Sequence, residues 1–238
     1  MLLKNGIGFI YHDDDIPIGD KMPTTDNEIR HKNNPQWGDH GVYISKGNSK
    51  MGNVPSFSTL PGCTCASDIP CREGCYAVKL ARIFKTLRAT LEANTQAVKE
   101  GRYDDITADV SAYLDAHPGV SLFRWNVSGD IYDAEFLGMM SKVAKKHPGV
   151  TFMAFTKQYG LIPADRGALP ENLRIVLSAW KRYRPADILT AKYPVAYYDD
   201  GTPECGIPSD AFHCQGDCER CQRCFKIDVG ESVYFTKH

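Results

Sequence analysis

The sequence lacks any apolar run long enough to cross a membrane. A spanning helix needs about 20 predominantly apolar residues, and no window of the 238-residue chain approaches that length. The apolar start of the chain runs into Asp13-Asp14-Asp15 without a long hydrophobic region, which is unlike a secretory signal. We therefore expect no membrane contact and a cytoplasmic location.

Neither sign of charge is in excess. The chain has 28 Lys and Arg against 29 Asp and Glu, a formal net charge of −1. Proteins dedicated to duplex nucleic acid usually carry a basic balance, so a nucleic-acid partner is unsupported. The expected partner is a small-molecule substrate, and the sequence leaves the oligomeric state open.

Cysteine is absent from the middle of the chain, residues 76–204, yet nine cysteines stand in two groups at 63–75 and 205–224. An odd total and tight spacing fit a disulfide framework poorly, and reducing compartments disfavour disulfides. Metal or cluster ligation is the favoured interpretation, with disulfides and redox thiols as lesser alternatives. The predicted metal ligands are Cys65, Cys71, Cys75, Cys205, Cys214, Cys218, Cys221 and Cys224.

Strand-like and helix-like segments alternate after the first cysteine group, which implies parallel βαβ units. The predicted fold is α/β, a partial or irregular β/α barrel with a cysteine-rich loop and a cysteine-rich C-terminal segment, favoured over an open doubly wound sheet. Residues 1–40 are expected to form an irregular arm and 41–238 a single β/α domain. Trp125 and Trp180 are assigned to the core. Strands are expected near 53–57 and at 120–127, 150–156, 173–180, 194–200 and 232–238, and helices at 76–99, near 106–114 and from Asp133.

The second cysteine group runs Cys214-x3-Cys218-x2-Cys221-x2-Cys224. Successive C-x2-C steps resemble ferredoxin-type ligation, whereas a structural zinc normally uses two C-x2-C pairs separated by a longer loop. An iron–sulfur cluster of the 4Fe–4S type is expected here, with zinc as the fallback. Cys205 is either a further ligand of this group or a lone core thiol.

The first cysteine group offers Cys65-x5-Cys71-x3-Cys75 just before a predicted helix. Amides at a helix N-terminus stabilise negative charge, and a thiolate-bound cluster is anionic. Cys63 is either a ligand or a small buried residue. The eight cysteines of the two tight clusters would make two four-ligand sites or one cluster with ligands from both ends, so one or two clusters are expected.

Polar residues follow the later strands as well. Loops after strand ends form the active face of β/α folds, so Ser128-Gly129-Asp130 and Lys157 are expected to meet the first cysteine group there. Asp130 is a candidate general base or cofactor-hydroxyl acceptor, with helix capping as the alternative. Lys157 is a candidate for binding an anionic substrate or acting as a tuned base, with a solvated lysine as the alternative.

Several segments carry a family resemblance. The run SKGNSKMGNVPSFSTLPGCTCASDIPCREGCYAVK, the segments RWNVSGDIYDAEFL and FMAFTKQY, and the C-terminal Cys-x2-Cys-x2-Cys-aromatic run resemble the phage gene product eighty-eight family. The resemblance covers about 40–238. It implies a phage-encoded, iron–sulfur-binding β/α protein acting in the infected host, with family cysteines at Cys65, Cys71, Cys75, Cys218, Cys221 and Cys224.

A more distant similarity is to radical S-adenosylmethionine enzymes, which place a cluster in the loop after the first strand of a partial β/α barrel. Their C-x3-C-x2-C signature is incomplete here, because Cys71-x3-Cys75 is followed by Tyr76-Ala77-Val78. Ser128 and Gly129 stand where those enzymes carry a cofactor-binding turn. The similarity implies S-adenosylmethionine as a possible cofactor.

Three functions follow as hypotheses. The first is an enzyme that uses an open iron at the barrel mouth as a Lewis acid to hydrolyse a small, ester-like substrate, with Asp130 and Lys157 as catalytic residues. The second is a radical S-adenosylmethionine-type enzyme. The third is a non-enzymatic binding protein that metal sites stabilise.

Overall fold

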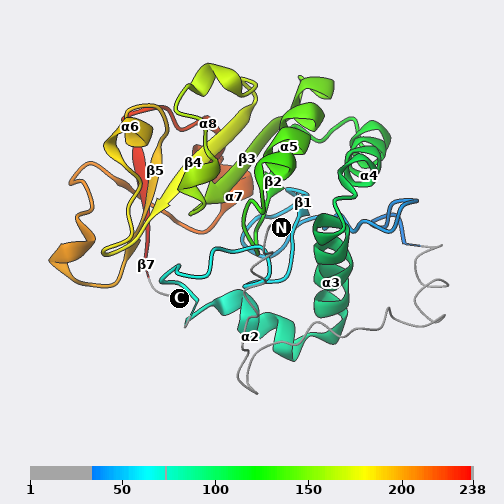
Figure 1. Cartoon of the computed structure of the whole chain (residues 1–238), viewed down its shortest axis with the longest axis horizontal. Helices are drawn as coiled ribbons and strands as arrows, with labels where there is room; N and C mark the ends of the chain where they lie inside the picture. Colours follow the sequence, from blue (N-terminus) through cyan, green and yellow to red (C-terminus); the bar gives the residue numbers. More distant parts are fainter. Residues whose placement is uncertain (1–33, 73, 237–238) are drawn as a thin grey trace, which may run out of the picture.

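The structure is a computed structural model that describes residues 34–72 and 74–236 (Figure 1). Most of the predicted arm, 1–33 of 1–40, lies outside the described residues. Residues 34–40 contain turns and one isolated bridge between Trp37 and Tyr43. The division of the chain at residue 40 stays a prediction.

Seven parallel strands form one sheet in the order β1-β2-β3-β4-β5-β7-β6. All pairings between neighbours are parallel, so the strands end at a common edge. The alternation in the sequence predicted all of them except the two-residue β6. The strands are β1 (Ser56–Phe57), β2 (Leu122–Trp125), β3 (Thr151–Thr156), β4 (Leu173–Ala179), β5 (Val195–Asp199), β6 (Phe212–His213) and β7 (Ser232–Thr236).

The sheet is open, so the predicted barrel is not confirmed as a closed structure. Strands β1 and β6 are its two edges. The outer side of β1 pairs through an antiparallel bridge, in which the backbones of Ser45 and Ser56 exchange two hydrogen bonds of 2.8 Å. Strands β1 to β5 nevertheless follow one another in space as in the chain, which differs from the reversed order of a doubly wound sheet.

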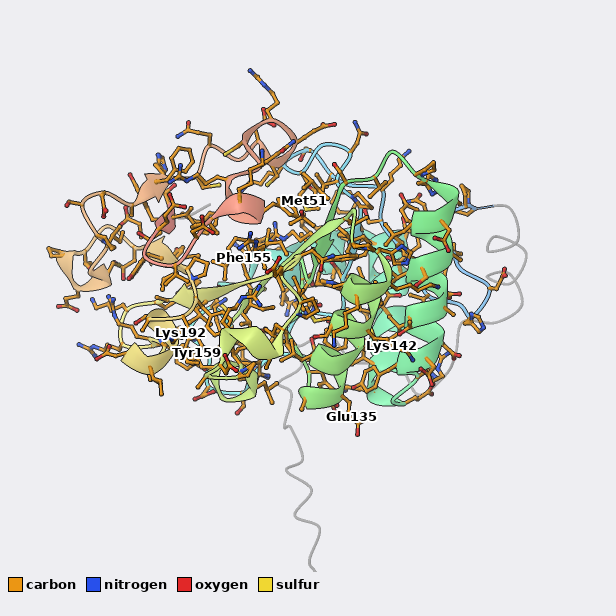
Figure 2. All side chains as sticks on the ribbon, turned by 90° about the horizontal axis from the view of Figure 1, so that it is seen from above. Met51, Glu135, Lys142, Phe155, Tyr159 and Lys192 are labelled. Atoms are coloured by element: carbon orange, nitrogen blue, oxygen red, sulfur yellow. The ribbon has the colours of Figure 1, made fainter. Side chains whose placement is uncertain are left out.

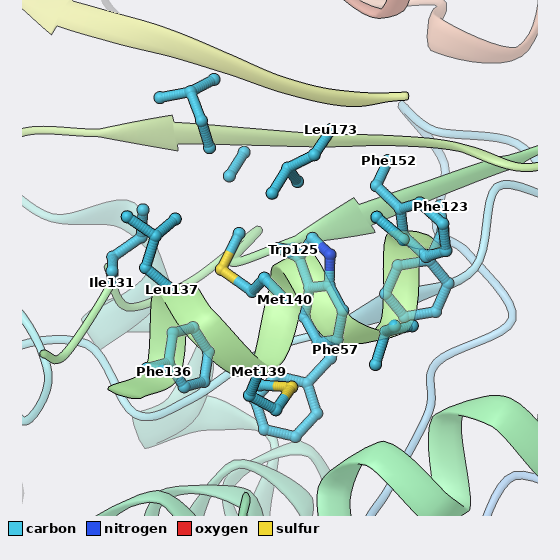
Figure 3. Packing of buried hydrophobic residues seen from close by; sticks show 14 of the residues in the cluster. Phe57, Phe123, Trp125, Ile131, Phe136, Leu137, Met139, Met140, Phe152 and Leu173 are labelled. Carbon is cyan, nitrogen blue, oxygen red and sulfur yellow. The ribbon is translucent and has the colours of Figure 1, made fainter. Parts of the chain in front are cut away.

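Helices cover one face of this sheet. Phe57, Trp125 and Phe136 belong to the main hydrophobic core between the sheet and the helices (Figure 3). The Trp125 ring lies 5.7 Å from the Phe57 ring and 6.3 Å from the Phe136 ring, centroid to centroid. The main helices are α2 (Tyr76–Ile83), α3 (Lys85–Lys99), α4 (Tyr103–Ala116) and α5 (Ala134–Lys146); shorter ones are α6 (Asp187–Thr190), α7 (Cys218–Cys221) and α8 (Arg223–Lys226), and the 3₁₀ turns are Tyr159–Leu161, Arg166–Ala168 and Pro203–Cys205.

The C-terminal cysteine segment covers the opposite face. Phe225 and Ile227 pack with Met153 and Val176 of the sheet and with Met51 in a second hydrophobic cluster. In Figure 2, Glu135 and Lys142 of α5 lie on one side of the molecule and Met51 on the other. The two faces of the sheet are therefore covered by different parts of the chain: α3, α4 and α5 cover one, and the C-terminal segment with the second cysteine group covers the other.

The helix predicted over 76–99 is two helices. Phe84 separates α2 from α3 with an extended backbone, φ −104° and ψ 94°. Leu80 and Phe84, expected on the buried face, are exposed, and Ala77 and Ala81 are buried instead. The spacing of apolar residues predicted one straight helix. The break at Phe84 instead lets α2 change direction and pack on the cysteine-rich loop.

No helix among the described residues has both the length and the apolar character needed to span a bilayer.

Candidate metal and substrate site

Hydrogen bonds join the loops after β1 and β2 at the carboxyl edge of the sheet. The Thr59 N–H donates to Ser128 O at 3.1 Å, and Ser128 Oγ donates to Thr59 O at 2.7 Å. The hydroxyls of Thr59 and Thr64 lie 2.8 Å apart, and Thr64 Oγ1 accepts from the Asp130 N–H at 3.0 Å. The predicted convergence of these two loops is confirmed.

Gly129 makes this close approach possible. Its φ is +82°, and a Cβ there would lie 1.9 Å from Thr59 Oγ1 and 2.7 Å from Thr64 Oγ1. Both the backbone conformation and the missing side chain are needed at this position. Ser128 and Gly129, predicted to bind a cofactor, hold the two loops together; their contact with a cofactor stays a prediction.

Asp130 is buried, and three donors share its carboxylate. Oδ1 accepts from Thr156 Oγ1 at 2.6 Å and from the Ile131 N–H at 2.8 Å, and Oδ2 accepts from the Lys157 N–H at 2.9 Å. Burial raises the pKa of Asp130, and the hydrogen bond from Thr156 is the largest opposing effect. Helix capping does not explain this residue, because Asp133 caps α5. Asp130 ties the end of β2 to the end of β3.

Lys157 lies near both Cys71 of the first cysteine group and an aromatic side chain. Its Nζ is 5.6 Å from the centre of the Trp180 ring. Its positive charge stabilises the ionised forms of both Cys71 and Asp130, and its carbonyl accepts from the Tyr183 hydroxyl at 3.0 Å. These contacts place Lys157 near Cys71 and Trp180, and its part in binding or catalysis stays a prediction.

Three cysteines of the first group gather beside these two residues. Burial raises the pKa of Cys65 to about 12, and the neighbouring Asp130, Cys71 and Cys75 add to the rise. Burial also raises the pKa of Cys71, with Lys157 opposing. Because the three thiols repel one another once ionised, a cation between them would favour their thiolate forms.

Cys63 packs in a different direction. Its side chain contacts the hydrophobic cluster that Leu60, Ala81 and Leu91 form beneath α2 and α3. The sequence left open whether Cys63 is a ligand or a small buried residue; its side chain is partly buried against this cluster, and its role stays a prediction.

The four thiols of the second group also lie near one another. Burial raises the pKa of Cys224 to about 12, and Cys214, Cys218 and Cys221 contribute to the rise. Cys218 and Cys224 pack against the hydrophobic cluster on the face of the sheet opposite α3, α4 and α5. Cys214, Cys218 and Cys221 are thus close enough to Cys224 to affect its ionisation, and a metal shared by the four thiols stays a prediction.

Arg124 of β2 faces this second group, and the sequence analysis did not identify it. Its guanidinium carbon lies 5.0 Å from the centre of the Phe155 ring, and its charge opposes the rise in pKa of Cys218 and Cys224. Its Nε is buried and has no hydrogen-bond partner within the described part of the chain. The alternation of β2, with Phe123 and Trp125 facing the helices, was the available signal that Arg124 points to the other face.

Cys205 has other partners. Its Sγ donates to Asp200 Oδ1 at 2.9 Å and accepts from the Asp200 N–H at 3.4 Å. Arg184 donates to its carbonyl, and the residue is buried behind the end of β5. These contacts favour the lone core thiol over the predicted metal ligand.

No disulfide joins two cysteines within residues 34–72 and 74–236. Among residues 34–72 and 74–236, no three His, Cys, Asp or Glu side chains are placed so that they could hold a metal ion as they stand. A single zinc ion needs sulfur ligands about 3.8 Å apart, given a Zn–S bond of about 2.3 Å. The thiols are neighbours without this geometry, and the metal stays a prediction.

The sequence analysis missed a second part of the site, at the ends of β4 and β5. Trp180, predicted to be core, is only half-buried and stacks on Tyr198, with ring centres 3.9 Å apart. The turn that follows Trp180 places Lys181 and Arg182 beside the pair. No local sequence pattern predicts the stacking, because the two aromatic residues come from different strands. The Lys-Arg pair directly after a strand was the one available signal for a binding site here.

Comparison of the sequence with known proteins shows which family the chain belongs to. It matches the family described as Gene product 88 over residues 24–227, which begins earlier than the resemblance seen from about residue 40. It is 24% identical over 149 residues to the Gene 88 protein of Mycobacterium phage L5, an alignment that covers 58% of this chain and 62% of that relative. The chain thus spans less than two thirds of the relative's length. No solved structure matches. With most of its length inside the family match, the chain belongs to the Gene product 88 family of phage proteins.

Proposed function

We propose that the chain is an iron–sulfur enzyme in which Cys65, Cys71 and Cys75 hold a 4Fe–4S cluster at the carboxyl edge of the sheet. The observation that carries the proposal is the gathering of these three thiols beside Asp130 and Lys157. Soft thiolates are the usual ligands of iron–sulfur clusters. Three protein ligands for four irons would leave one iron open to a small molecule.

Such an iron, when bound, supplies a Lewis acid. The proposed reaction is hydrolysis of a small, ester-like substrate: the water oxygen bonds to the acyl carbon and releases a proton to solvent, the bond to the alcohol oxygen breaks, and the alcohol oxygen takes up a proton. Lys157 would orient a negative substrate group or donate this proton; its electrostatic effect on Cys71 and its ammonium 5.6 Å from the centre of the Trp180 ring support this role. Asp130 acts as a positioning residue, since its carboxylate accepts from the Lys157 backbone N–H.

The four thiols at 214–224 would form a closed site with no position left for substrate, holding a second 4Fe–4S cluster or a zinc ion. The backbone of this segment is already fastened to the domain: the Cys218 N–H donates to Lys50 O at 2.8 Å and the Cys214 N–H to Tyr234 O at 3.0 Å. A metal there would add its binding free energy to the folding of this segment. Its proposed role is structural.

A radical S-adenosylmethionine-type reaction is the second candidate. The observation that favours it is the position of the three thiols, in the loop after β1 of a parallel sheet whose strands β1 to β5 follow chain order. The same open iron would bind the cofactor in place of the ester, with the turn Ser128-Gly129 nearby.

The experiment is hydrolysis of chromogenic esters by protein prepared without air. The C71S variant is expected to lose turnover, whereas C63S, altered in the same loop but outside the thiol group, retains it. The K157M variant is expected to lose about 10²-fold in kcat/KM, with K192M as the control for charge. Equal turnover by C71S and C63S contradicts the proposal. A visible spectrum that changes only on adding S-adenosylmethionine, without ester turnover, supports the second candidate.

A further inference from the structure

A pocket of about 360 Å³ lies between Pro70, in the loop that carries the first cysteine group, and the carboxyl ends of two strands. One wall is Pro70, which directly precedes Cys71, and the others come from the ends of β4 and β5. The volume is within the range of small-molecule sites. The residues lining it are Pro70, Trp180, Lys181, Arg182, Tyr198 and Asp200.

The apolar part of the pocket is a stacked aromatic pair. The rings of Trp180 and Tyr198 are 14° from parallel, with centres 3.9 Å apart. Lys157 adds a positive charge 5.6 Å from the centre of the Trp180 ring. A flat, electron-rich surface next to a cation suits a ligand that has both a planar ring and a negative group.

Two of the three charged residues in the lining are already paired. Lys181 Nζ lies 2.7 Å from Glu204 Oε2. Asp200 accepts from the Cys205 thiol and from the backbone and hydroxyl of Thr202. The Arg182 guanidinium, in contrast, has no ion pair or hydrogen bond within the part of the chain that the structure describes.

The backbone of Arg182 is strained. It stands in a two-residue turn closed by the Trp180 N–H to Tyr183 O and the Tyr183 N–H to Trp180 O, at 2.8 and 3.0 Å. Its φ is +60°, a conformation that normally selects glycine or asparagine. A strained residue that makes no structural contact of its own is typical of a binding site.

We propose that this pocket is the substrate site of the enzyme and takes a small anion with a flat ring, whose carboxylate or phosphate Arg182 binds while Trp180 and Tyr198 hold the ring. The inference rests on the proposed function, because the ligand would lie against Pro70 and so next to the cluster. It narrows the substrate class from ester-like molecules in general to those that also carry a flat ring and a negative group.

The test is isothermal titration of the full chain, prepared without air, with adenosine monophosphate, benzoate, adenosine and inorganic phosphate. Adenosine monophosphate and benzoate carry both a ring and an anion and are expected to bind more tightly than adenosine or phosphate. The ratio of the dissociation constants of these two ligands shows whether the pocket prefers a phosphate or a carboxylate. The R182N variant is expected to lose about tenfold in affinity for the tighter of these anions but not for adenosine. Its melting temperature should stay equal or rise by a few degrees, since asparagine tolerates this backbone.

R182G is a second variant with the same expectation, and K192N controls for loss of a surface cation at the opposite end of β5. The inference is overturned if no ring-bearing anion binds, or if R182N and R182G bind them as tightly as the unaltered chain. If protein that contains its cluster binds none of these ligands, the proposed substrate pocket is refuted and the proposed cluster is not. If the ligands bind to a chain that never acquires iron, the proposed cluster is refuted and the proposed pocket is not.

Discussion

Replacing Gly129 with alanine tests the contact between the loops that carry the site. At φ +82° a side chain costs about 1–2 kcal/mol. The new Cβ would also lie 1.9 Å from Thr59 Oγ1, so the loop must move, and forced overpacking typically costs about 1–3 kcal/mol. The G129A variant should therefore lose about 2–5 kcal/mol of unfolding free energy, measured by urea denaturation without air.

A matched control variant separates the cost of the backbone conformation from the cost of the steric clash. Gly101 also has a positive φ, +68°, but nothing lies within 4 Å of the position its Cβ would take. G101A should lose only the backbone cost of about 1–2 kcal/mol. Because Thr64 contacts Gly129 and precedes Cys65, G129A should also lower the iron content of the first site, and G101A should not. Equal losses of stability in the two variants refute the steric argument.

Two further predictions concern buried carboxylates. D130N should lose about 2–3 kcal/mol of unfolding free energy, because the new amide cannot accept from all three donors of Asp130; urea denaturation measures it, and a loss below about 0.5 kcal/mol contradicts it. The second concerns His40, whose pKa the hydrogen bond to Asp109, 2.7 Å long, raises above 6.5. The stabilisation from protonated His40 is full below about pH 6.5 and is lost as the pH rises through the raised pKa. The difference in unfolding free energy between the unaltered chain and H40N should therefore be larger at about pH 5.5 than at about pH 8.5, by less than about 1 kcal/mol because the imidazole is half-exposed. An equal or larger difference at the higher pH contradicts it.

Local patterns in the sequence were sufficient for most of the fold. Alternating strand and helix segments located β1 to β5 and β7, and Asp133 marked the start of α5, where its side chain accepts from the Phe136 N–H at 2.7 Å. The break at Phe84 was missed because its cause is tertiary: α2 turns to cover the cysteine loop. Closure of the sheet was beyond local patterns too, since it depends on whether two edge strands far apart in the sequence meet.

Only part of the candidate site was predicted, because only part of it depends on local sequence patterns. Cys65, Cys71 and Cys75 share one short loop, so their spacing carried the information. The distinction between Cys63 and its neighbours depends on which side chain points into the cluster beneath α2. The stacking of Trp180 on Tyr198 depends on the register of β4 and β5, which places Ala179 beside Tyr197; no short stretch of sequence encodes it.

Metal binding by the two groups of thiols can be measured as the content of iron, acid-labile sulfide and zinc in the chain and in four variants purified without air. We expect iron and sulfide in the unaltered chain, loss of the first-site iron in C71S, loss of the second-site metal in C221S, and unchanged content in C63S and C205S. A chain without iron and sulfide, or equal metal content in C71S and C63S, would refute iron–sulfur binding at these thiols.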